Sequence, residues 1–385
     1  VLSRAQSAAD IFGSRLRVSP SSIEKYENCP FSYFLNSGLS LKERQKAELT
    51  PLSNGDIIHY VLQHVVSAHG GAGIAALSEE ELRAEIESVL AEYMNNFFGT
   101  AENKPARFLY LYERLAGTLF KLLRRLGEEF KASEFLPYAF ELPVGKGGEV
   151  GAYTLTAPDG HEVVVEGKID RVDIMDKNGS RFVRVIDYKS GGKVFALSDV
   201  YYGLNMQMLM YLFAIWKDGK GELKSCVPAG ILYMPAINPV LPGERGDSKE
   251  AAAEKENKKL HMNGLLLNDE MVLNAMEPGL HGVFIPVKKG KDGITSTKEA
   301  TLASLEQLGK IKTYVDGLLL GMAESLYGGA IPALPYKKKD WTSCEYCSFA
   351  AVCRRSSQSP FRQMEEFKPD EFYKRTEGGD ENGRA

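Results

Sequence analysis

The sequence lacks a long apolar run and is poor in cysteine, and these two absences exclude whole classes of protein. A membrane-spanning helix needs about 20 consecutive apolar residues, and no such run occurs in the 385 residues. Val1-Leu2-Ser3-Arg4 is not the charged start of a signal peptide, and five cysteines are too few for a disulfide scaffold. We therefore expect a cytoplasmic protein without membrane segments. Because the first residue is not methionine, we also expect a piece of a longer chain or a processed chain.

Two further features are missing, an excess of basic residues and a nucleotide-binding loop. The chain has 47 lysines and arginines against 51 acidic residues, which gives a formal net charge of -4. Any contact with DNA must then come from local basic surface, because a phosphate responds to nearby charge. Ser190-Gly191-Gly192-Lys193 lacks the upstream spacing of a phosphate-binding loop. We therefore expect no ATP hydrolysis by this chain.

The hydrophobic content, 44% of the residues, is sufficient for a sizeable core. Apolar spacing predicts helices beginning near Ile23 and at about 54–68, 79–97, 105–132, 198–217 and 297–327, with strands between 140 and 187 and at 230–234 and 283–285. We divide the chain into a linker or lead-in segment (1–17), one domain (18–360) with an exposed insertion at about 242–260, and a frayed polar tail (361–385).

Acidic residues stand at the ends of two predicted neighbouring strands, 163–170 and 181–187, which Asn178-Gly179 would join by a tight turn. The first strand ends in Asp170, and the second in Asp187, two residues before Lys189. Side chains at i and i+2 of a strand share a face, so Asp187 and Lys189 can address one water molecule together. Two carboxylates hold a hard cation, and a lysine positions or deprotonates an attacking water. The pattern predicts a magnesium-dependent phosphodiesterase, although either acid alone could simply cap nearby backbone.

Four segments resemble the RecB-like branch of the PD-(D/E)XK nucleases in order and approximate spacing. They are Gly55-x3-His59, Gly167-Lys168-Ile169-Asp170, Ile186-Asp187-Tyr188-Lys189-Ser190 and Gln207-x3-Tyr211. The resemblance implies a restriction-endonuclease-like α/β fold, with a central mixed sheet flanked by helices and a helical N-terminal region. It also implies that Asp170, Asp187 and the backbone carbonyl of Tyr188 hold Mg²⁺, and that His59 is an extra metal ligand or a histidine of the site. In the same way it implies that Lys189 is the catalytic lysine and that Gln207 and Tyr211 line the active site.

Each of these helical residues also has a plainer interpretation. Taken alone, His59 could be a half-buried helix histidine, and Gln207 and Tyr211 could be a buried polar pair on one helix face. Glu166 could join the metal cluster, but we expect it at the surface, and we expect a structural role for Asp173.

The cysteines are more informative in position than in number. Cys344-x2-Cys347-x5-Cys353 and the distant Cys29 make a four-ligand set, which zinc or a 4Fe-4S cluster could use. We favour the cluster, because zinc sites more often come as two close pairs. The split set is similar to that of the nuclease region of AddB subunits of AddAB helicase-nucleases, and this resemblance implies a 4Fe-4S clasp that joins the chain ends without redox chemistry. Cys226 is expected to be a buried, apolar-like residue.

The resemblance implies Mg²⁺-dependent exonuclease or endonuclease cleavage of single-stranded DNA within a complex that processes double-strand breaks. The resemblance also implies that the partner is an AddA-type helicase-nuclease subunit and that the 5′-terminated strand is the one cut. Basic residues within 105–132, and Lys337-Lys338-Lys339 beside Trp341, could contact DNA or simply be solvated surface.

Two alternatives stay open. The first is a free-standing RecB-like iron-sulfur exonuclease. The second is a non-catalytic DNA-binding or assembly module of the same fold. The complete set of His59, Asp170, Asp187 and Lys189 argues against the module, because an assembly role would not require all four.

Overall fold

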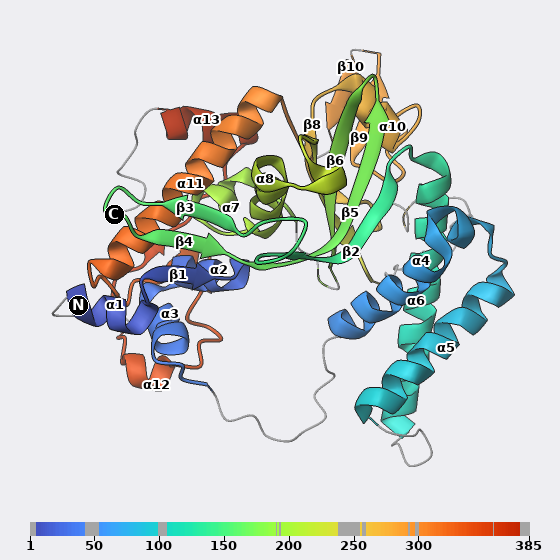
Figure 1. Cartoon of the computed structure of the whole chain (residues 1–385). Helices are drawn as coiled ribbons and strands as arrows, with labels where there is room; N and C mark the ends of the chain where they lie inside the picture. The colour runs from blue at the N-terminus through green and yellow to red at the C-terminus, as the bar shows by residue number, and fades with distance from the viewer. Residues whose placement is uncertain are drawn as a thin grey trace.

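The computed structural model describes residues 5–42, 54–98, 106–189, 191, 194–237, 255, 259–291, 293–296, 300–356 and 358–377. A six-stranded mixed sheet lies at the centre (Figure 1). In spatial order its strands are β11 (Ala300–Ala303), β8 (Asn263–Leu267), β7 (Val227–Pro235), β6 (Ser180–Lys189), β5 (Gly167–Lys177) and β2 (Leu136–Val144). β6 pairs with β7 in parallel, and β8 pairs with β11 in parallel, whereas the other neighbours are antiparallel. The expected central mixed sheet is confirmed.

The hairpin of β5 and β6 carries the acids that the sequence singled out. Asn178 and Gly179 turn it with φ angles of 52° and 75°, as a two-residue turn of this kind requires. The single strand expected at 163–170, however, is two strands that part at Glu166. β4 (Glu162–Val165) belongs to a separate three-stranded sheet, between β1 (Arg15–Val18) and β3 (Tyr153–Thr156). The prediction was wrong because the apolar residues on both sides of Glu166 resemble one continuous strand, although they belong to two different sheets.

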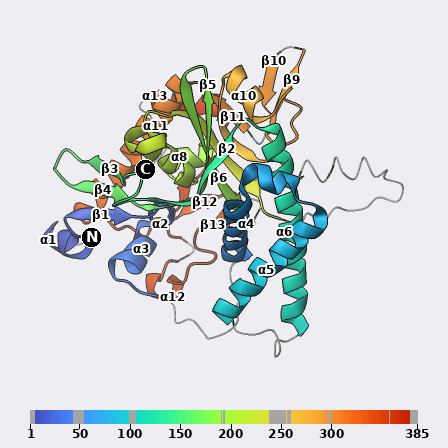
Figure 2. The ribbon, with the colours of Figure 1, turned by 45° about the vertical axis from the view of Figure 1, so that its right-hand side comes forward.

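Three helices form an arm beside β2, and the lower ends of α5 and α6 project away from the sheet in Figure 2. They are α4 (Asn54–Ala76), α5 (Glu79–Phe98) and α6 (Ala106–Ala132), close to the expected ranges. α4 continues further than predicted and bends at Gly70, whose φ of 65° and ψ of 173° are not helical. α4 packs on α5, α6, β2 and β6, so the arm is anchored to the sheet at β2 and at β6, the strand that carries Asp187.

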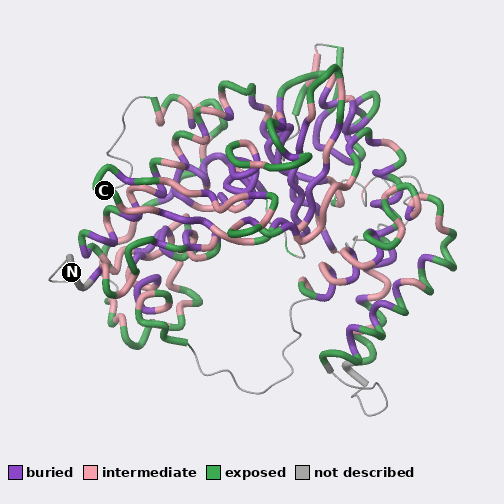
Figure 3. Tube along the Cα trace, in the orientation of Figure 1, coloured by how far each residue is buried: buried purple, intermediate pink, exposed green. Residues whose placement is uncertain are grey.

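On the other side of the sheet lie α7 (Leu197–Tyr201), α8 (Gln207–Asp218) and α11 (Leu305–Tyr327). The helix predicted at 198–217 is interrupted between α7 and α8, because Gly203 and Asn205 take positive φ angles of 76° and 60°. The helix predicted from 297 begins instead at Leu305, where Ser304 and Gln307 form a capping box. Buried positions concentrate along the central strands and α8 (Figure 3).

The strand predicted at 283–285 is not formed. The backbone N–H groups of Val283, Phe284 and Ile285 donate to the buried carboxylate of Glu277 at 2.7, 2.8 and 2.9 Å. Amides satisfied in this way are not available to a ladder, and the next strand begins only at Val287.

Both chain ends pack against one another. The N-terminal part consists of α1 (Ala5–Phe12), β1, α2 (Pro20–Asn28), α3 (Pro30–Tyr33) and a π-helical turn (Phe34–Gly38). The C-terminal part contains β12 (Tyr336–Lys338), β13 (Trp341–Thr342), α12 (Ala350–Cys353), β14 (Arg362–Gln363) and α13 (Pro369–Glu377). Ser343 Oγ donates to the Asn28 carbonyl at 3.1 Å, and the Phe31 amide donates to the Pro332 carbonyl at 3.2 Å.

The frayed tail expected at 361–385 is wrong for its described part, 361–377. This part forms β14 and α13, and Phe372 is fully buried, 5.2 Å from the Tyr314 ring. Of the insertion expected at 242–260, only Lys255, Lys259 and Leu260 lie within the described residues. The remaining short elements are a 3-10 turn (Gly221–Leu223), α10 (Glu270–Met276), β9 (Val287–Gly290) and β10 (Gly293–Ser296). Within the described ranges, the structure contains no helix of sufficient length and apolarity to cross a membrane.

Candidate metal centre and cysteine cavity

Asp170 on β5 and Asp187 on β6 lie on adjacent strands, at the place where the arm meets the sheet. Lys189 Nζ is 2.5 Å from Asp187 Oδ2, so these two side chains share a face as the i, i+2 spacing predicted. The Tyr188 backbone N–H donates to Asp170 Oδ2 at 3.2 Å, which ties the two strands together at the acids. Asp187 is buried, whereas Lys189 is partly exposed.

His59 reaches the acids from α4. Its Nδ1 lies 3.5 Å from Asp170 Oδ1 and 3.3 Å from Glu141 Oε1. Its ring stands edge-on to the Tyr188 ring, with centroids 5.8 Å apart and planes at 86°. His59 is a half-buried helix histidine, as its plainer interpretation has it, but its ring contacts two carboxylates.

Glu141 completes the group, and the sequence analysis did not identify it. It lies in β2 with a φ of 53°, which is uncommon for a residue other than glycine. Its neighbours Phe140 and Leu142 pair with Arg171 and Ile169, so Glu141 stands beside Asp170. The ligand atoms of His59, Glu141 and Asp170 all lie within 4.8 Å of one another. An acid inside the otherwise apolar β2 was the one signal that could have indicated it.

The electrostatics of this group favour a cation. Burial and the neighbouring charge of Asp187 raise the pKa of Asp170 to about 7. Burial opposes the charge of His59, yet its contacts with Glu141 and Asp170 raise the pKa of His59 overall. Burial also opposes the charge of Glu141, but hydrogen bonds with His59 and Lys168 lower its pKa. Asp170 is thus the carboxyl with too little compensating positive charge, which a bound cation would supply.

The donor set fits a hard divalent cation. Oxygen ligands from carboxylates suit Mg²⁺, and one imidazole among them is compatible with Mn²⁺ as well. Asp187 adjoins the group of three, and among the described residues no hydrogen bond reaches its Oδ2, which Lys189 contacts as an ion pair. Asp170, Glu141 and His59 would hold the ion, with Asp187 beside them. The part expected of the Tyr188 carbonyl stays a prediction.

Gln207 and Tyr211 reach this site from α8. The Tyr211 hydroxyl accepts a hydrogen bond from the Lys168 amide at 3.2 Å, and the neighbouring Gln207 side chain lowers the pKa of the same hydroxyl. Burial, together with the charges of Asp170 and Asp187, raises the pKa of Tyr211, which therefore remains a neutral phenol. Tyr211 fixes the start of β5, three residues before Asp170.

Other candidates lie elsewhere. Glu166 pairs with Arg17 at 2.7 Å, which agrees with its expected surface position. Asp173 is fully buried among charged partners, in agreement with a structural role. Lys338 and Lys339 form ion pairs with Glu366 at 3.3 and 3.1 Å, so part of this basic run is engaged within the fold.

Four cysteines from the two chain ends line one small cavity of about 160 Å³, together with Phe31, Phe349 and Arg355. These cysteines are Cys29, Cys344, Cys347 and Cys353. All are free thiols, and burial raises the pKa of Cys29 with a further contribution from Cys353 and Cys347. Four sulfur donors around one cavity fit either a zinc ion or a 4Fe-4S cluster. Cys226 is buried elsewhere, with its Sγ 3.5 Å from the Glu222 carbonyl, as expected for a non-ligand.

The chain is similar in sequence to a known superfamily and to several named proteins. The sequence profile of the PD-(D/E)XK nuclease superfamily matches residues 17–354. The B subunit of the ATP-dependent helicase/deoxyribonuclease of Clostridium acetobutylicum is 33% identical over 98% of this chain and 34% of the relative. The B subunit of Acetivibrio thermocellus is 32% identical over 97% of this chain and 33% of the relative. The B subunit of Clostridioides difficile is 32% identical over 88% of this chain and 30% of the relative. The chain spans about a third of the length of these relatives.

Proposed function

Because the chain belongs to the PD-(D/E)XK nuclease superfamily, we propose that it hydrolyses DNA phosphodiester bonds with Mg²⁺ as the nuclease part of a helicase-nuclease. The observation that carries this proposal is the meeting of His59, Glu141 and Asp170 within 4.8 Å, directly beside the Asp187–Lys189 pair. The relatives are named as parts of an ATP-dependent helicase/deoxyribonuclease, which supports the assembly.

The side chains divide the work. Bound Mg²⁺ would neutralise charge that develops on the phosphate and lower the pKa of a coordinated water. Lys189, held by Asp187 and partly exposed, orients the attacking water and stabilises negative charge in the transition state. Tyr211 and Gln207 keep the start of β5, and thus Asp170, in place.

The test is cleavage of end-labelled single-stranded DNA in the presence of Mg²⁺. We expect Asp187→Ala to reduce the rate by about 100-fold or more, because Lys189 loses the carboxylate that holds it and the cation loses a neighbouring negative charge. We expect a chelator to abolish cleavage. Glu166→Gln is the matched control, since this acid pairs with Arg17 outside the site and its loss should leave the rate unchanged. An Asp187→Ala protein that cleaves normally with Mg²⁺ would remove the assignment.

The cysteine cavity is proposed to hold a 4Fe-4S cluster. The support is the convergence of four thiols from the two chain ends on one cavity of about 160 Å³. The cluster would fasten α2 and α3 to the C-terminal segment. After anaerobic purification, we expect a brown protein with about four iron atoms per chain. A colourless protein with one zinc per chain would replace the cluster by a structural zinc site.

A further part of the proposal concerns the helicase-nuclease complex to which the chain would belong. We propose an AddA-type subunit as partner, double-strand break processing as the role, and the 5′-terminated strand as the one that is cut. Duplex DNA labelled at either the 5′ or the 3′ end, degraded by the complex with Asp187→Ala in this chain, separates the strands. Continued loss of the 5′-terminated strand would contradict the polarity.

A further inference from the structure

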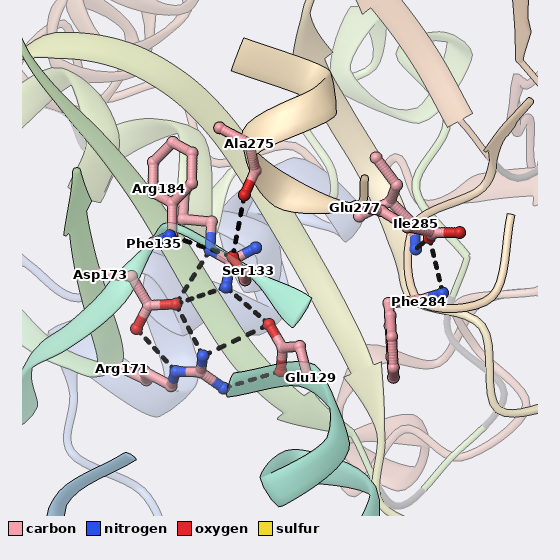
Figure 4. Close-up of polar contacts among 10 residues, drawn as sticks. All are labelled: Glu129, Ser133, Phe135, Arg171, Asp173, Arg184, Ala275, Glu277, Phe284 and Ile285. Atoms are coloured by element: carbon pink, nitrogen blue, oxygen red, sulfur yellow. Dashed lines mark hydrogen bonds and ion pairs between the residues drawn. The ribbon is translucent and has the colours of Figure 1, made fainter. Parts of the chain in front are cut away.

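Four fully buried charged side chains form a cluster between α6 of the arm and the strands β5 and β6 of the sheet (Figure 4). They are Glu129 on α6, Arg171 and Asp173 on β5, and Arg184 on β6. Arg171 donates twice to Asp173, both times at 2.7 Å, and to Glu129 at 3.3 and 3.4 Å. Arg184 donates to Asp173 at 2.9 Å and to Glu129 at 2.6 Å. We call this group the buried charge cluster.

The buried charge cluster is costly to assemble. Removing charges from water opposes folding, and well-packed apolar residues in the place of a buried ion pair often give equal or greater stability. The two arginines and two carboxylates balance, and each guanidinium also lies over an aromatic ring, Arg171 over Phe130 at 4.6 Å and Arg184 over Phe135 at 5.0 Å. Such an arrangement specifies one geometry between α6, β5 and β6 better than an apolar contact would.

Tyr188 lies between the buried charge cluster and the metal centre. Arg171 directly follows Asp170, and Tyr188 lies between Asp187 and Lys189, so both side chains alternate with site residues along their strands. Arg171 pairs with Ile186, so the side chains of Arg171 and Tyr188 lie on the same face of the β5–β6 hairpin. The Tyr188 side chain is buried there, and burial raises the pKa of its phenol while the charge of Arg171 lowers it. The Tyr188 backbone N–H donates to Asp170, and the Tyr188 ring packs edge-on against His59. Tyr188 is thus a neighbour of the buried charge cluster on one face of the hairpin, and it contacts Asp170 and His59, two of the three residues that could hold the cation.

We propose that the buried charge cluster positions the metal centre, by holding Tyr188 and, through it, Asp170 and His59. Glu129, Arg171, Asp173 and Arg184 are positioning residues, since none of them reaches the reacting atoms. The inference rests on the proposed function, because it assumes that the donor group binds a divalent cation.

The decisive experiment compares two buried glutamates. Glu129→Gln keeps the shape of the side chain but leaves the two arginines with one carboxylate. Glu277→Gln is the matched control, because Glu277 is also buried and its carboxylate likewise accepts several hydrogen bonds, but from backbone amides of 283–285. Mn²⁺ affinity is measured by electron paramagnetic resonance at a temperature well below both midpoints of unfolding, and Tm is measured in parallel.

We expect both variants to lower Tm, whereas only Glu129→Gln weakens Mn²⁺ binding, by about 10-fold or more, the range for partners of metal ligands. A double variant, Glu129→Gln with Arg184→Gln, restores the charge balance and should bring the affinity back to within about 3-fold of the original protein. If Glu129→Gln does not fold, the Mn²⁺ affinity of the double variant is compared with that of the original protein instead.

The outcomes are distinct. If folded Glu129→Gln binds Mn²⁺ as tightly as the original protein, the positioning role is wrong and the buried charge cluster serves stability alone. An equal loss of affinity in Glu277→Gln would lead to the same conclusion. If the original protein binds Mn²⁺ no better than Asp170→Asn does, these residues are not a metal centre. The proposed function and the positioning role are then both wrong.

Discussion

The Tyr211 hydroxyl occupies the space that a side chain at Gly167 would need. A Cβ on Gly167 would overlap this hydroxyl and lie 3.0 Å from Tyr211 Cζ. The contact joins α8 to the first residue of β5, and the Lys168 amide donates to the same hydroxyl. The glycine is therefore required by an approach of two elements at the edge of the metal centre.

Gly167→Ala should displace Tyr211 or the start of β5 and shift Asp170. We expect a loss of stability of about 1–3 kcal/mol from the overlap and a cleavage rate reduced by about 10-fold or more, since small displacements of positioned groups are costly. The measurements are thermal unfolding and single-turnover cleavage. Gly151→Ala, where a Cβ would meet only an ordinary contact at 3.5 Å, should change neither. Normal cleavage by Gly167→Ala would show that Tyr211 does not position the site.

Glu141→Gln should weaken metal binding and spare the chemical step. The variant keeps the side-chain shape but removes one of the negative charges that attract the cation, so we expect the Mg²⁺ concentration at half-maximal cleavage to rise by about 10-fold or more. Saturating Mg²⁺ should recover most of the rate. A rate that stays low at every Mg²⁺ concentration would instead assign Glu141 to the reaction itself.

Lys189→Met should spare metal binding and slow the chemical step, the opposite of the result expected for Glu141→Gln. The ammonium group contacts Asp187 and is not a metal ligand, so Mn²⁺ affinity should be retained while the rate falls by about 100-fold. Lys338→Met, at a lysine engaged with Glu366, serves as the control with normal cleavage. Retained activity in Lys189→Met would exclude Lys189 from catalysis.

Cys353→Ser should remove the proposed cluster. We expect loss of iron and of the visible absorbance, and a Tm lower by about 5 °C or more because the two chain ends are no longer fastened. Cys226→Ser, outside the cavity, should keep the full iron content. Equal iron content in both variants would contradict the ligand assignment.

Phe372→Ala tests whether α13 belongs to the folded core. Phe372 is fully buried, so we expect its truncation to cost about 3–5 kcal/mol in the free energy of unfolding. Phe97→Ala, at a side chain that is 63% exposed, should change the stability by less than about 0.5 kcal/mol. Denaturant unfolding gives both values, and a small loss at Phe372 would show that α13 contributes little.

Much of the site was accessible from the sequence, because Asp170, Asp187 and Lys189 are fixed by strand alternation within one hairpin. His59 could be added only through a resemblance, since its contact with Asp170 joins a helix and a strand far apart in the chain. Glu141 was missed because its position depends on a positive φ and on the pairing of β2 with β5, and neither appears as a local pattern. Local periodicity also could not show that the chain changes sheets at Glu166, or that the amides of 283–285 serve Glu277.

The cysteine cavity has a consequence for how the protein is made. Cys29 leaves the ribosome first, whereas Cys344, Cys347 and Cys353, which complete the cavity, follow about 300 residues later. At a synthesis rate of about 5–20 residues per second, Cys29 waits about 15–60 s for its partners. The segment around Cys29 therefore cannot reach its final packing before the other three cysteines are made. Its last folding step, and any loading of the cavity, must follow their emergence, so a chain truncated before Cys344 would expose an unsatisfied thiol.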